Sequence, residues 1–324
     1  MQIERRRLMT AALATATLYS VGQSASAQDA WPSKPIRMIL PYAGGGSADT
    51  VARAIADQLR ASLGQMVIVE SRPGANSMLG AEMVATSPAD GYTLLYLGWP
   101  TISTNLVVYK DVRYKLADFQ PLTTIFTSPV SLTVRKDLAV SNLKELLDYA
   151  RKQGGISFGT SGVGSSPHLL MERLSKETGV PLRHVPYKGE SPAVLDVIGG
   201  HLPVFAGSIA TPLTHIRAGT LKVVATSSDE RLVAFPEAPT FKESGFKNHV
   251  FTYWHGFALP ANTPKPIVDK FHAAIVAAMN APQVRQVLSV DQIPTTISPA
   301  AFKDLIQHDI DTWAPVIRAA NLVE

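Results

Sequence analysis

The 324-residue sequence contains no cysteine. Disulfide bonds, thiolate nucleophiles and cysteine-based metal sites are therefore excluded. The eight histidines include no pair at HxxxH or HxH spacing, so we expect no metal site. The nucleotide-binding patterns GxxxxGK(S/T) and GxGxxG are also missing, and we expect no cofactor. Without these supports, the chain must derive its stability from hydrophobic cores.

An excess of charge of one sign is missing as well. The formal net charge is +4, and it falls to +2 when residues 1–27, which hold three Arg and one Glu, are left out. No cluster of Lys and Arg occurs after Arg7, which disfavours nucleic acid as a partner. No apolar run after residue 27 approaches the roughly 20 residues that span a bilayer.

The first 27 residues have the pattern of an export signal. Three arginines at positions 5–7 precede a mostly apolar run over residues 8–21, and Ala25-Ser26-Ala27 offers a small-residue cleavage site. We expect a signal peptide over residues 1–27, cleavage after Ala27 and a periplasmic location. The general secretory route and the twin-arginine route both remain open.

The stretch around which the chain is organised covers residues 36–63. A short apolar run predicts a buried parallel strand, three consecutive glycines (Gly44, Gly45 and Gly46) predict a loop, and Ser47 is placed to cap a helix. Such an element directs unpaired backbone N–H groups at an anion. No Lys or Arg lies in the loop, so a carboxylate fits better than a phosphate. A tight turn without a ligand is the alternative.

A second stretch repeats this pattern. Residues 156–158 predict a short strand, residues 159–166 a loop of small and hydroxyl-bearing residues, and Ser166-Pro167 the start of a helix. His168 in its first turn either donates to a ligand or supports the loop. Tyr187 has the reach to enter a cleft, and Asp196 faces either a helix surface or a ligand amine.

Further patterns suggest the edges of the site and of the domains. The loop 98–101 follows a predicted strand over residues 92–97, and it and Gly207-Ser208 are candidate further walls of the site. Residues 119–126 and 130–134 predict two strands at the crossing from a first to a second domain. Ser141 is expected to open a helix, and Pro315 to end or kink the last one.

Several segments together resemble the Bug (Bordetella uptake gene) family, the extracytoplasmic solute-binding receptors of tripartite tricarboxylate transporters. They follow the family order and cover nearly the whole mature chain. The segments are residues 40–49 (LPYAGGGSAD), 87–95 (SPADGYTLL), 118–123 (DFQPLT), 159–169 (GTSGVGSSPHL), 185–202 (VPYKGESPAVLDVIGGHL), 217–231 (RAGTLKVVATSSDER), 257–264 (FALPANTP) and 298–313 (SPAAFKDLIQHDIDTW).

This resemblance implies a two-lobed α/β fold of the periplasmic-binding-protein (Venus-flytrap) kind. Each lobe holds a central, mostly parallel sheet flanked by helices. Lobe 1 covers residues 28–127 and 250–324, and lobe 2 covers residues 128–249. The implied protein is a monomer that delivers a small carboxylate to integral-membrane permease subunits.

The resemblance also carries ligand-binding residues over to this chain. From the residues and the resemblance together, the predicted set is Tyr42, Ala43, Gly44, Gly45, Gly46, Ser47, Asp49, Thr160, Ser161, Gly164, Ser165, His168, Tyr187 and Asp196. Within this set, Asp49 is expected to order the first loop.

Two other functions compete with transport. An exported serine hydrolase would use Ser161, Ser165 or Ser166 as nucleophile and His168 as base, but no GxSxG frame supports it, and we expect no enzyme. A carboxylate sensor that is not coupled to transport is the other alternative. Neither the identity of the carboxylate nor the choice between transport and sensing follows from the sequence.

Overall fold

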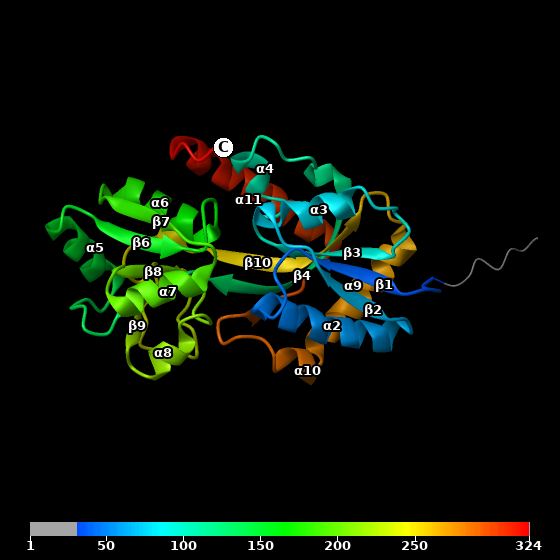
Figure 1. Cartoon of the computed structure of the whole chain (residues 1–324), viewed down its shortest axis with the longest axis horizontal. Coiled ribbons are helices and arrows are strands. Elements are labelled where there is room, and N and C mark those ends of the chain that lie inside the picture. The colour runs from blue at the N-terminus through cyan, green and yellow to red at the C-terminus, as the bar shows by residue number, and fades with distance from the viewer. Residues whose placement is uncertain (1–30, 324) are drawn as a thin grey trace, which may run out of the picture. The chain divides into compact units, whose positions relative to one another are not determined.

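A computed structural model of the chain describes residues 31–323, and the signal peptide expected over residues 1–27 lies outside this range. The described part contains two mixed β-sheets with helices packed on them (Figure 1). All of these elements lie in one compact unit that begins at Lys34. Within residues 31–323, none of the helices combines the length and the apolar character needed to cross a membrane.

The first sheet has six strands in the order β11-β4-β10-β3-β1-β2. The strands are β1 (Ile36–Leu40), β2 (Val67–Ser71), β3 (Thr93–Gly98), β4 (Phe119–Pro129), β10 (Thr252–Pro260) and β11 (Ile293–Pro294). β1 pairs in parallel with β2 and β3, and the other pairings are antiparallel. In β1, Ile36, Met38, Ile39 and Leu40 have no exposed surface, as expected of a central parallel strand.

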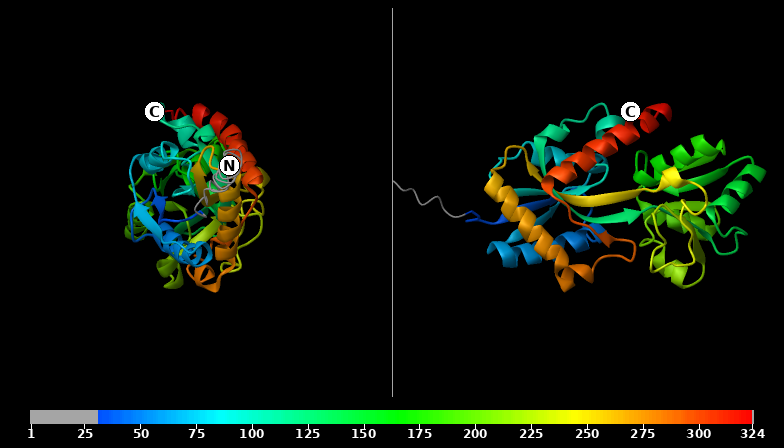
Figure 2. Two further views of the ribbon diagram at one scale, coloured as in Figure 1. Left: turned by 90° about the vertical axis from the view of Figure 1, so that its right-hand side faces the viewer. Right: turned by 180° about the vertical axis from the view of Figure 1, so that it is seen from behind.

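Helices cover this sheet on its faces. They are α2 (Ser47–Leu63), α3 (Met78–Ala85), α4 (Asn105–Val108), α9 (Lys265–Asn280), α10 (Pro282–Arg285) and α11 (Pro299–Ala319), with short 3-10 turns η1 (Ala75–Ser77) and η2 (Leu116–Asp118). α2 packs against β2 and α9, while α9 and α11 pack on β4. Seen from behind, α9 and α11 cover the same face of the sheet (Figure 2).

The second sheet has five strands in the order β7-β6-β8-β5-β9. Its strands are β5 (Ser131–Arg135), β6 (Ile156–Thr160), β7 (Leu182–Pro186), β8 (Val204–Gly207) and β9 (Leu221–Thr226). Its helices are α5 (Leu143–Lys152), α6 (Ser166–Thr178), α7 (Glu190–Gly199) and α8 (Leu213–Arg217), followed by the turn η3 (Lys247–His249). β6 pairs in parallel with β7 and β8.

The chain passes from the first sheet to the second between β4 and β5, and returns between β9 and β10. The strands at these two passages make both sheets mixed rather than mostly parallel. β4 runs through to Pro129, beyond the predicted end at Phe126, and only Val130 separates it from β5. β5 is antiparallel to β8 and β9, and β10 is antiparallel to β3 and β4. A chain that passes directly from one sheet into the next enters the second sheet without a crossover helix, so it does not join the parallel set.

Three predicted helix starts were wrong by one residue. The N-caps are Gly46, Asn142 and Ser165 instead of Ser47, Ser141 and Ser166. At α5 the reason is clear, because Asn142 Oδ1 accepts from the backbone N–H of Glu145 at 2.9 Å. This bond satisfies one of the unpaired N–H groups of the first turn.

Of the two outcomes expected at Pro315, an end or a kink of the last helix, the end was wrong, since α11 continues to Ala319. A proline inside a helix removes one backbone hydrogen bond and crowds the preceding turn. Trp313, Ala314 and Ile317 are buried around this position. Packing of these side chains therefore holds the last turns in helical form.

Candidate functional site

A cavity of about 370 Å³ is lined by loops that follow strands of both sheets. Residues of the first sheet and its connections supply one half of the lining: Tyr42, Ser47, Ala48, Asn76, Trp99, Pro100, Phe126, Tyr253, His255 and Gln292. The second sheet and its connections supply the other half: Ser161, Ser165, Ser166, Pro167, Gly189, Glu190, Gly207, Ser208, Ala210 and Thr211.

The N-terminus of α2 faces this cavity. Ser47 and Ala48 are the first two residues of the helix, and both line the cavity. The first backbone bond of the helix runs from Thr50 N–H to Gly46 C=O at 3.1 Å, so the N–H groups of Ser47 and Ala48 have no partner within α2. These two groups and the helix dipole favour a negative ligand group.

The N-terminus of α6 faces the same cavity from the second sheet. Ser165, Ser166 and Pro167 line it, and the first backbone bond of α6 joins Leu169 N–H to Ser165 C=O at 3.0 Å. Ser161 also lines the cavity. Two helix N-termini from separate sheets thus face one space, an arrangement that can hold a carboxylate from both sides.

Asp49 orders the glycine loop that precedes α2. Its Oδ2 accepts from Gly45 N–H at 2.9 Å, and its Oδ1 pairs with Arg53 Nε at 2.9 Å. The guanidinium of Arg53 and then the Gly45 N–H lower the pKa of Asp49. The Gly45 N–H is therefore already used inside the loop. Of the predicted residues in this region, Tyr42 and Ser47 line the cavity, and Ala43, Gly44, Gly45, Gly46 and Asp49 do not.

Internal hydrogen bonds order the second loop in the same way. Thr160 Oγ1 accepts from Gly162 N–H at 3.2 Å and lies 2.7 Å from His184 Nε2. Ser165 Oγ donates to Gly162 C=O at 2.8 Å. Thr160 does not itself line the cavity, whereas Ser161 and Ser165 do.

His168 supports this loop through a hydrogen bond to its backbone. It is almost fully buried, and its Nδ1 accepts from Gly164 N–H at 3.1 Å. Its ring stacks on that of His184 with 3.7 Å between centroids. Burial, with the neighbouring His168, lowers the pKa of His184 to about 3, so this imidazole stays neutral. Neither His168 nor Gly164 lines the cavity.

Tyr187 and Asp196 bind each other instead of entering the cavity. The Tyr187 hydroxyl donates to Asp196 Oδ2 at 2.5 Å, and neither residue is part of the lining. Burial and this bond raise the pKa of Tyr187 to about 12. The carboxylate of Asp196 is thus engaged with a neighbouring residue that precedes it by nine positions.

An aromatic wall completes the cavity on the side of the first sheet. The His255 ring stacks on Phe126 with 4.7 Å between centroids, and its Nδ1 lies 3.0 Å from the Tyr96 hydroxyl. Burial lowers the pKa of His255 to about 3, which keeps it neutral. Tyr253 and His255 lie on β10, where no local motif marks them, and sequence reasoning missed both.

The loops suggested as further walls do contribute, through Trp99, Pro100, Gly207 and Ser208. Trp99 is held from behind, since its Nε1–H donates to Asp309 Oδ2 at 3.0 Å. Gln292 reaches the cavity from the segment before β11, and its amide donates to Ser47 Oγ at 3.3 Å. Among residues 31–323, no group of three His, Asp or Glu side chains could hold a metal ion.

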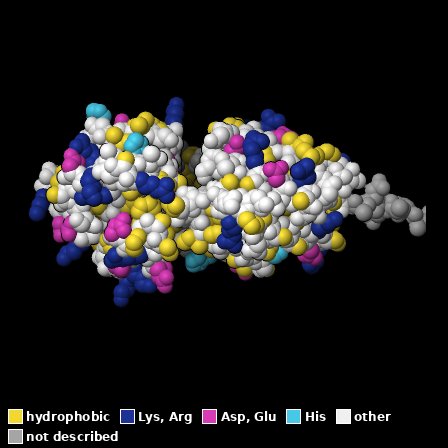
Figure 3. All heavy atoms as spheres, turned by 90° about the horizontal axis from the view of Figure 1, so that it is seen from below, with side chains coloured by type: hydrophobic (Ala, Val, Ile, Leu, Met, Phe, Trp, Pro, Cys, Tyr) yellow, Lys and Arg dark blue, Asp and Glu magenta, His cyan; other side chains and the backbone are white. Residues whose placement is uncertain are grey.

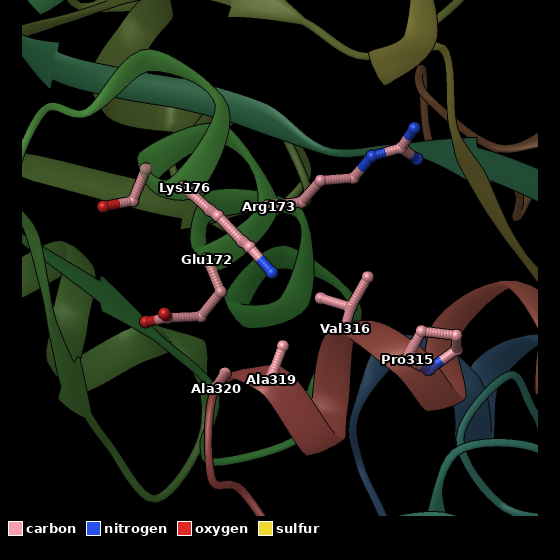
Figure 4. A pocket seen from close by; sticks show the side chains of 8 residues that line it. Glu172, Arg173, Lys176, Pro315, Val316, Ala319 and Ala320 are labelled. Carbon is pink, nitrogen blue, oxygen red and sulfur yellow. The ribbon is translucent and has the colours of Figure 1, made fainter.

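A second hollow of about 430 Å³ lies between α6 and the end of α11 (Figure 4). Glu172, Arg173 and Lys176 lie on one side, and Pro315, Val316 and Ala319 on the other. None of the predicted ligand-binding residues lines it. On the face shown in Figure 3, basic and acidic side chains are interspersed, without a broad field of one sign.

Comparisons with known proteins agree with this geometry. Residues 51–322 match the model of the family described as the tripartite tricarboxylate transporter family receptor. Protein BugT of Bordetella pertussis is 33% identical over 294 residues, covering 90% of both chains.

Solved structures of such proteins are also similar. The periplasmic binding protein BugD has a TM-score of 0.78 at 31% identity, covering 90% of this chain and 99% of its own. MatC of Rhodopseudomonas palustris, solved with bound malate, has a TM-score of 0.77 at 28% identity, covering 89% of this chain and 100% of its own. These likenesses confirm the expected α/β architecture of a periplasmic binding protein.

Proposed function

The chain belongs to the family of tripartite tricarboxylate transporter receptors, which includes the Bug proteins, and we propose that it captures a small carboxylate in the cavity and delivers it to permease subunits in the membrane. The family consists of periplasmic solute-binding receptors and not of enzymes. The hydrolase alternative also lacks a catalytic pair. Among residues 31–323, His168 forms no hydrogen bond with Ser161, Ser165 or Ser166.

The convergence of two helix N-termini carries this proposal. Hydrogen bonds to a charged group contribute about 1.5–3 kcal/mol each, and a cavity shielded from water strengthens them. Among residues 31–323, no Lys or Arg lines the cavity, so backbone N–H groups and hydroxyls hold the carboxylate. The malate bound to MatC supports a carboxylate as the ligand class.

We further propose that the two sheets form two lobes that close on the ligand. Lobe 1 comprises residues 28–127 and 250–324, and lobe 2 comprises residues 128–249. Closure would move the N-terminus of α6 and the N-terminus of α2 toward the same carboxylate. The mature protein would begin at Gln28 in the periplasm, which mass spectrometry of the exported protein tests directly.

Calorimetric titration with monocarboxylates, dicarboxylates, amino acids, neutral sugars and simple cations tests the ligand class. We expect at least one carboxylate to bind and to raise the melting temperature, by an amount that grows with the logarithm of the ligand concentration divided by its Kd. Binding of only sugars or only cations would overturn the proposal.

Two variants of Ser47 separate the backbone from the hydroxyl. Proline suits the first helical position, and Gly46 before it is already extended (φ −87°, ψ 177°), so Ser47→Pro removes the N–H with little strain. We expect Ser47→Pro to weaken carboxylate binding about tenfold, the loss of one charge-assisted hydrogen bond. Ser47→Ala, which keeps the N–H, is the matched control and should bind nearly as well as the wild type. Equal losses in both variants would exclude capture by the backbone N–H of this residue.

A further inference from the structure

Glu190 is the one Asp, Glu, Lys or Arg side chain among the described residues that line the cavity. It is the first residue of α7, and it lies in the same space as the N-termini of α2 and α6. No ion pair to Glu190 is present among residues 31–323. A cavity proposed to take an anion thus contains a negative charge of its own.

Hydrogen bonds hold the Glu190 carboxylate in place without neutralising it. Its Oε1 accepts from the backbone N–H of Ser208 at 3.1 Å, and its Oε2 accepts from the Thr211 hydroxyl. Both donors are uncharged. These bonds tie the start of α7 to the connection after β8, so a structural role for Glu190 must be separated from a role in binding.

A second carboxylate lies close behind the first. Asp291 has no exposed surface, and its Oδ2 accepts from the Ser208 hydroxyl at 2.6 Å and from Ile209 N–H at 3.1 Å. Glu190 and Asp291 therefore bind the same residue, one through its N–H and the other through its hydroxyl. The remaining oxygen of Asp291, Oδ1, is buried and has no hydrogen-bond partner among the described residues.

Both acids act on the cavity itself. Tyr253 lines it, and burial together with the charges of Asp291 and Glu190 raises the pKa of this phenol. Burial also raises the pKa of Glu190, with Asp291 adding to the effect. Two carboxylates that are partly removed from water without a cation raise the free energy of the folded protein. A positive group of the ligand would lower this free energy.

We propose, on the basis of the function proposed above, that the ligand is a zwitterion. Its carboxylate binds at the N-termini of α2 and α6, and a protonated amine in the same molecule binds against Glu190, with Asp291 behind. The aromatic rings of Trp99, Phe126 and Tyr253 in the lining suit a cation as well, through its attraction to their faces. A dicarboxylate such as the malate of MatC would bring a second negative charge toward Glu190.

Length-matched ligands test this proposal at pH 7, where amines are protonated. Titration calorimetry compares ω-amino carboxylates with dicarboxylates of the same number of methylene groups, and with the plain monocarboxylates. α-Amino acids and their trimethylated betaines complete the panel. We expect at least one amine-bearing member to bind about tenfold or more tighter than its matched diacid and monoacid. A wild-type preference for the diacids overturns the zwitterion and leaves the receptor function intact, whereas binding of no carboxylate overturns both.

Glu190→Gln separates the charge of Glu190 from its hydrogen bonds, because the amide oxygen still accepts from Ser208. We expect this variant to lose about tenfold in affinity for the amine-bearing ligand and to lose nothing for the diacids. Glu230→Gln removes the same charge from an exposed position on the same lobe, and it should bind like the wild type. An unchanged ratio of amine to diacid affinity in Glu190→Gln overturns the assignment. If Glu190→Gln does not fold, the comparison of amine-bearing ligands with diacids on the wild-type protein still tests the proposal.

Discussion

At the scale of single residues, Asp309 holds two buried indoles behind the cavity. Its Oδ2 accepts from Trp99 Nε1 at 3.0 Å and from Trp254 Nε1 at 2.7 Å. Both indoles are about 1% exposed, so neither can turn to water if the carboxylate is lost. Asp309 thus links α11 to β10 and to the loop that follows β3, where Trp99 lines the cavity.

Replacing Asp309 with leucine should destabilise the protein by about 2–5 kcal/mol, because two buried N–H donors lose their acceptor at once. Urea unfolding followed by tryptophan fluorescence measures this change. Asp304→Leu, on an exposed position of the same helix, is the control and should shift the free energy of unfolding by less than about 0.5 kcal/mol. Similar effects of both substitutions would show that the indole bonds contribute little.

The ionisation of Asp309 leads to a second prediction at this scale, on how stability depends on pH. Burial raises its pKa to about 6, although the two indole bonds act in the opposite direction. The folded state therefore favours the protonated acid, and the stability from this group is present below pH 4 and lost as the pH rises through about 6. Asp309→Asn does not titrate, so its stability relative to the wild type should improve between pH 4 and pH 8. A difference that stays constant over this range would contradict the raised pKa.

At the scale of elements, the end of β3 and the first loop fit together through a glycine. A Cβ atom at Gly98 would lie 1.8 Å from the Tyr42 hydroxyl, far inside van der Waals contact. Tyr42 forms part of the cavity lining, and burial raises the pKa of its phenol to about 12. The close approach of these two segments therefore depends on a residue without a side chain.

Gly98→Ala should displace Tyr42 from the cavity wall, destabilise the fold by about 1–3 kcal/mol and weaken ligand binding. Adding Tyr42→Phe removes the clashing hydroxyl and should recover part of the stability. Tyr42→Phe alone is the reference, and a double-mutant cycle in unfolding and in calorimetry gives the coupling. Additive effects would show that the two residues do not meet.

At the scale of the whole molecule, two neutral histidines make stability depend on pH. His184 and His255, one on each sheet, both have a pKa of about 3 in the folded protein because of burial. In the unfolded chain a histidine titrates near 6.5, so the unfolded state binds more protons between these values. Full stability is present above about pH 6.5 and is lost as the pH falls toward 3.

His184 and His255 should therefore make unfolding at pH 5 take up about two more protons than at pH 8. Burial also lowers the pKa of His249, which adds to this uptake, while the raised pKa values of Asp309 and Glu190 oppose it. Urea midpoints measured at half-unit pH steps give this number. The double variant His184→Gln/His255→Gln should flatten most of the profile, whereas His201→Gln, on an exposed position between α7 and β8, should leave it unchanged. A wild-type midpoint that does not fall below pH 6.5 would exclude the two buried histidines as its cause.

Local spacing of residues predicts the parts of the site that lie within one short stretch. The apolar run of β1, the glycine loop and the helix α2 follow from the spacing of residues over 36–63, and β6 and α6 repeat them. The direction of a helix N-terminus depends only on such local order, so the proposed preference for an anion could be predicted from the sequence. The resemblance to the Bug family came from eight short segments, two of which contain these loops, and the family comparison confirms it.

Which groups meet in the cavity depends on contacts that no short stretch of the chain reveals. Tyr187 and Asp196 were candidates for the ligand, yet they bind each other. Glu190, Tyr253, His255 and Gln292 carry no local motif, and the pairing of β10 with β3 and the approach of Asp291 to Ser208 bring them together. Local spacing determines helix and strand faces because it depends on neighbours in the chain. Contacts between distant segments, such as that of Ser208 with Asp291 83 positions along the chain, depend instead on how the finished sheets pack, and this sets the charge inside the cavity.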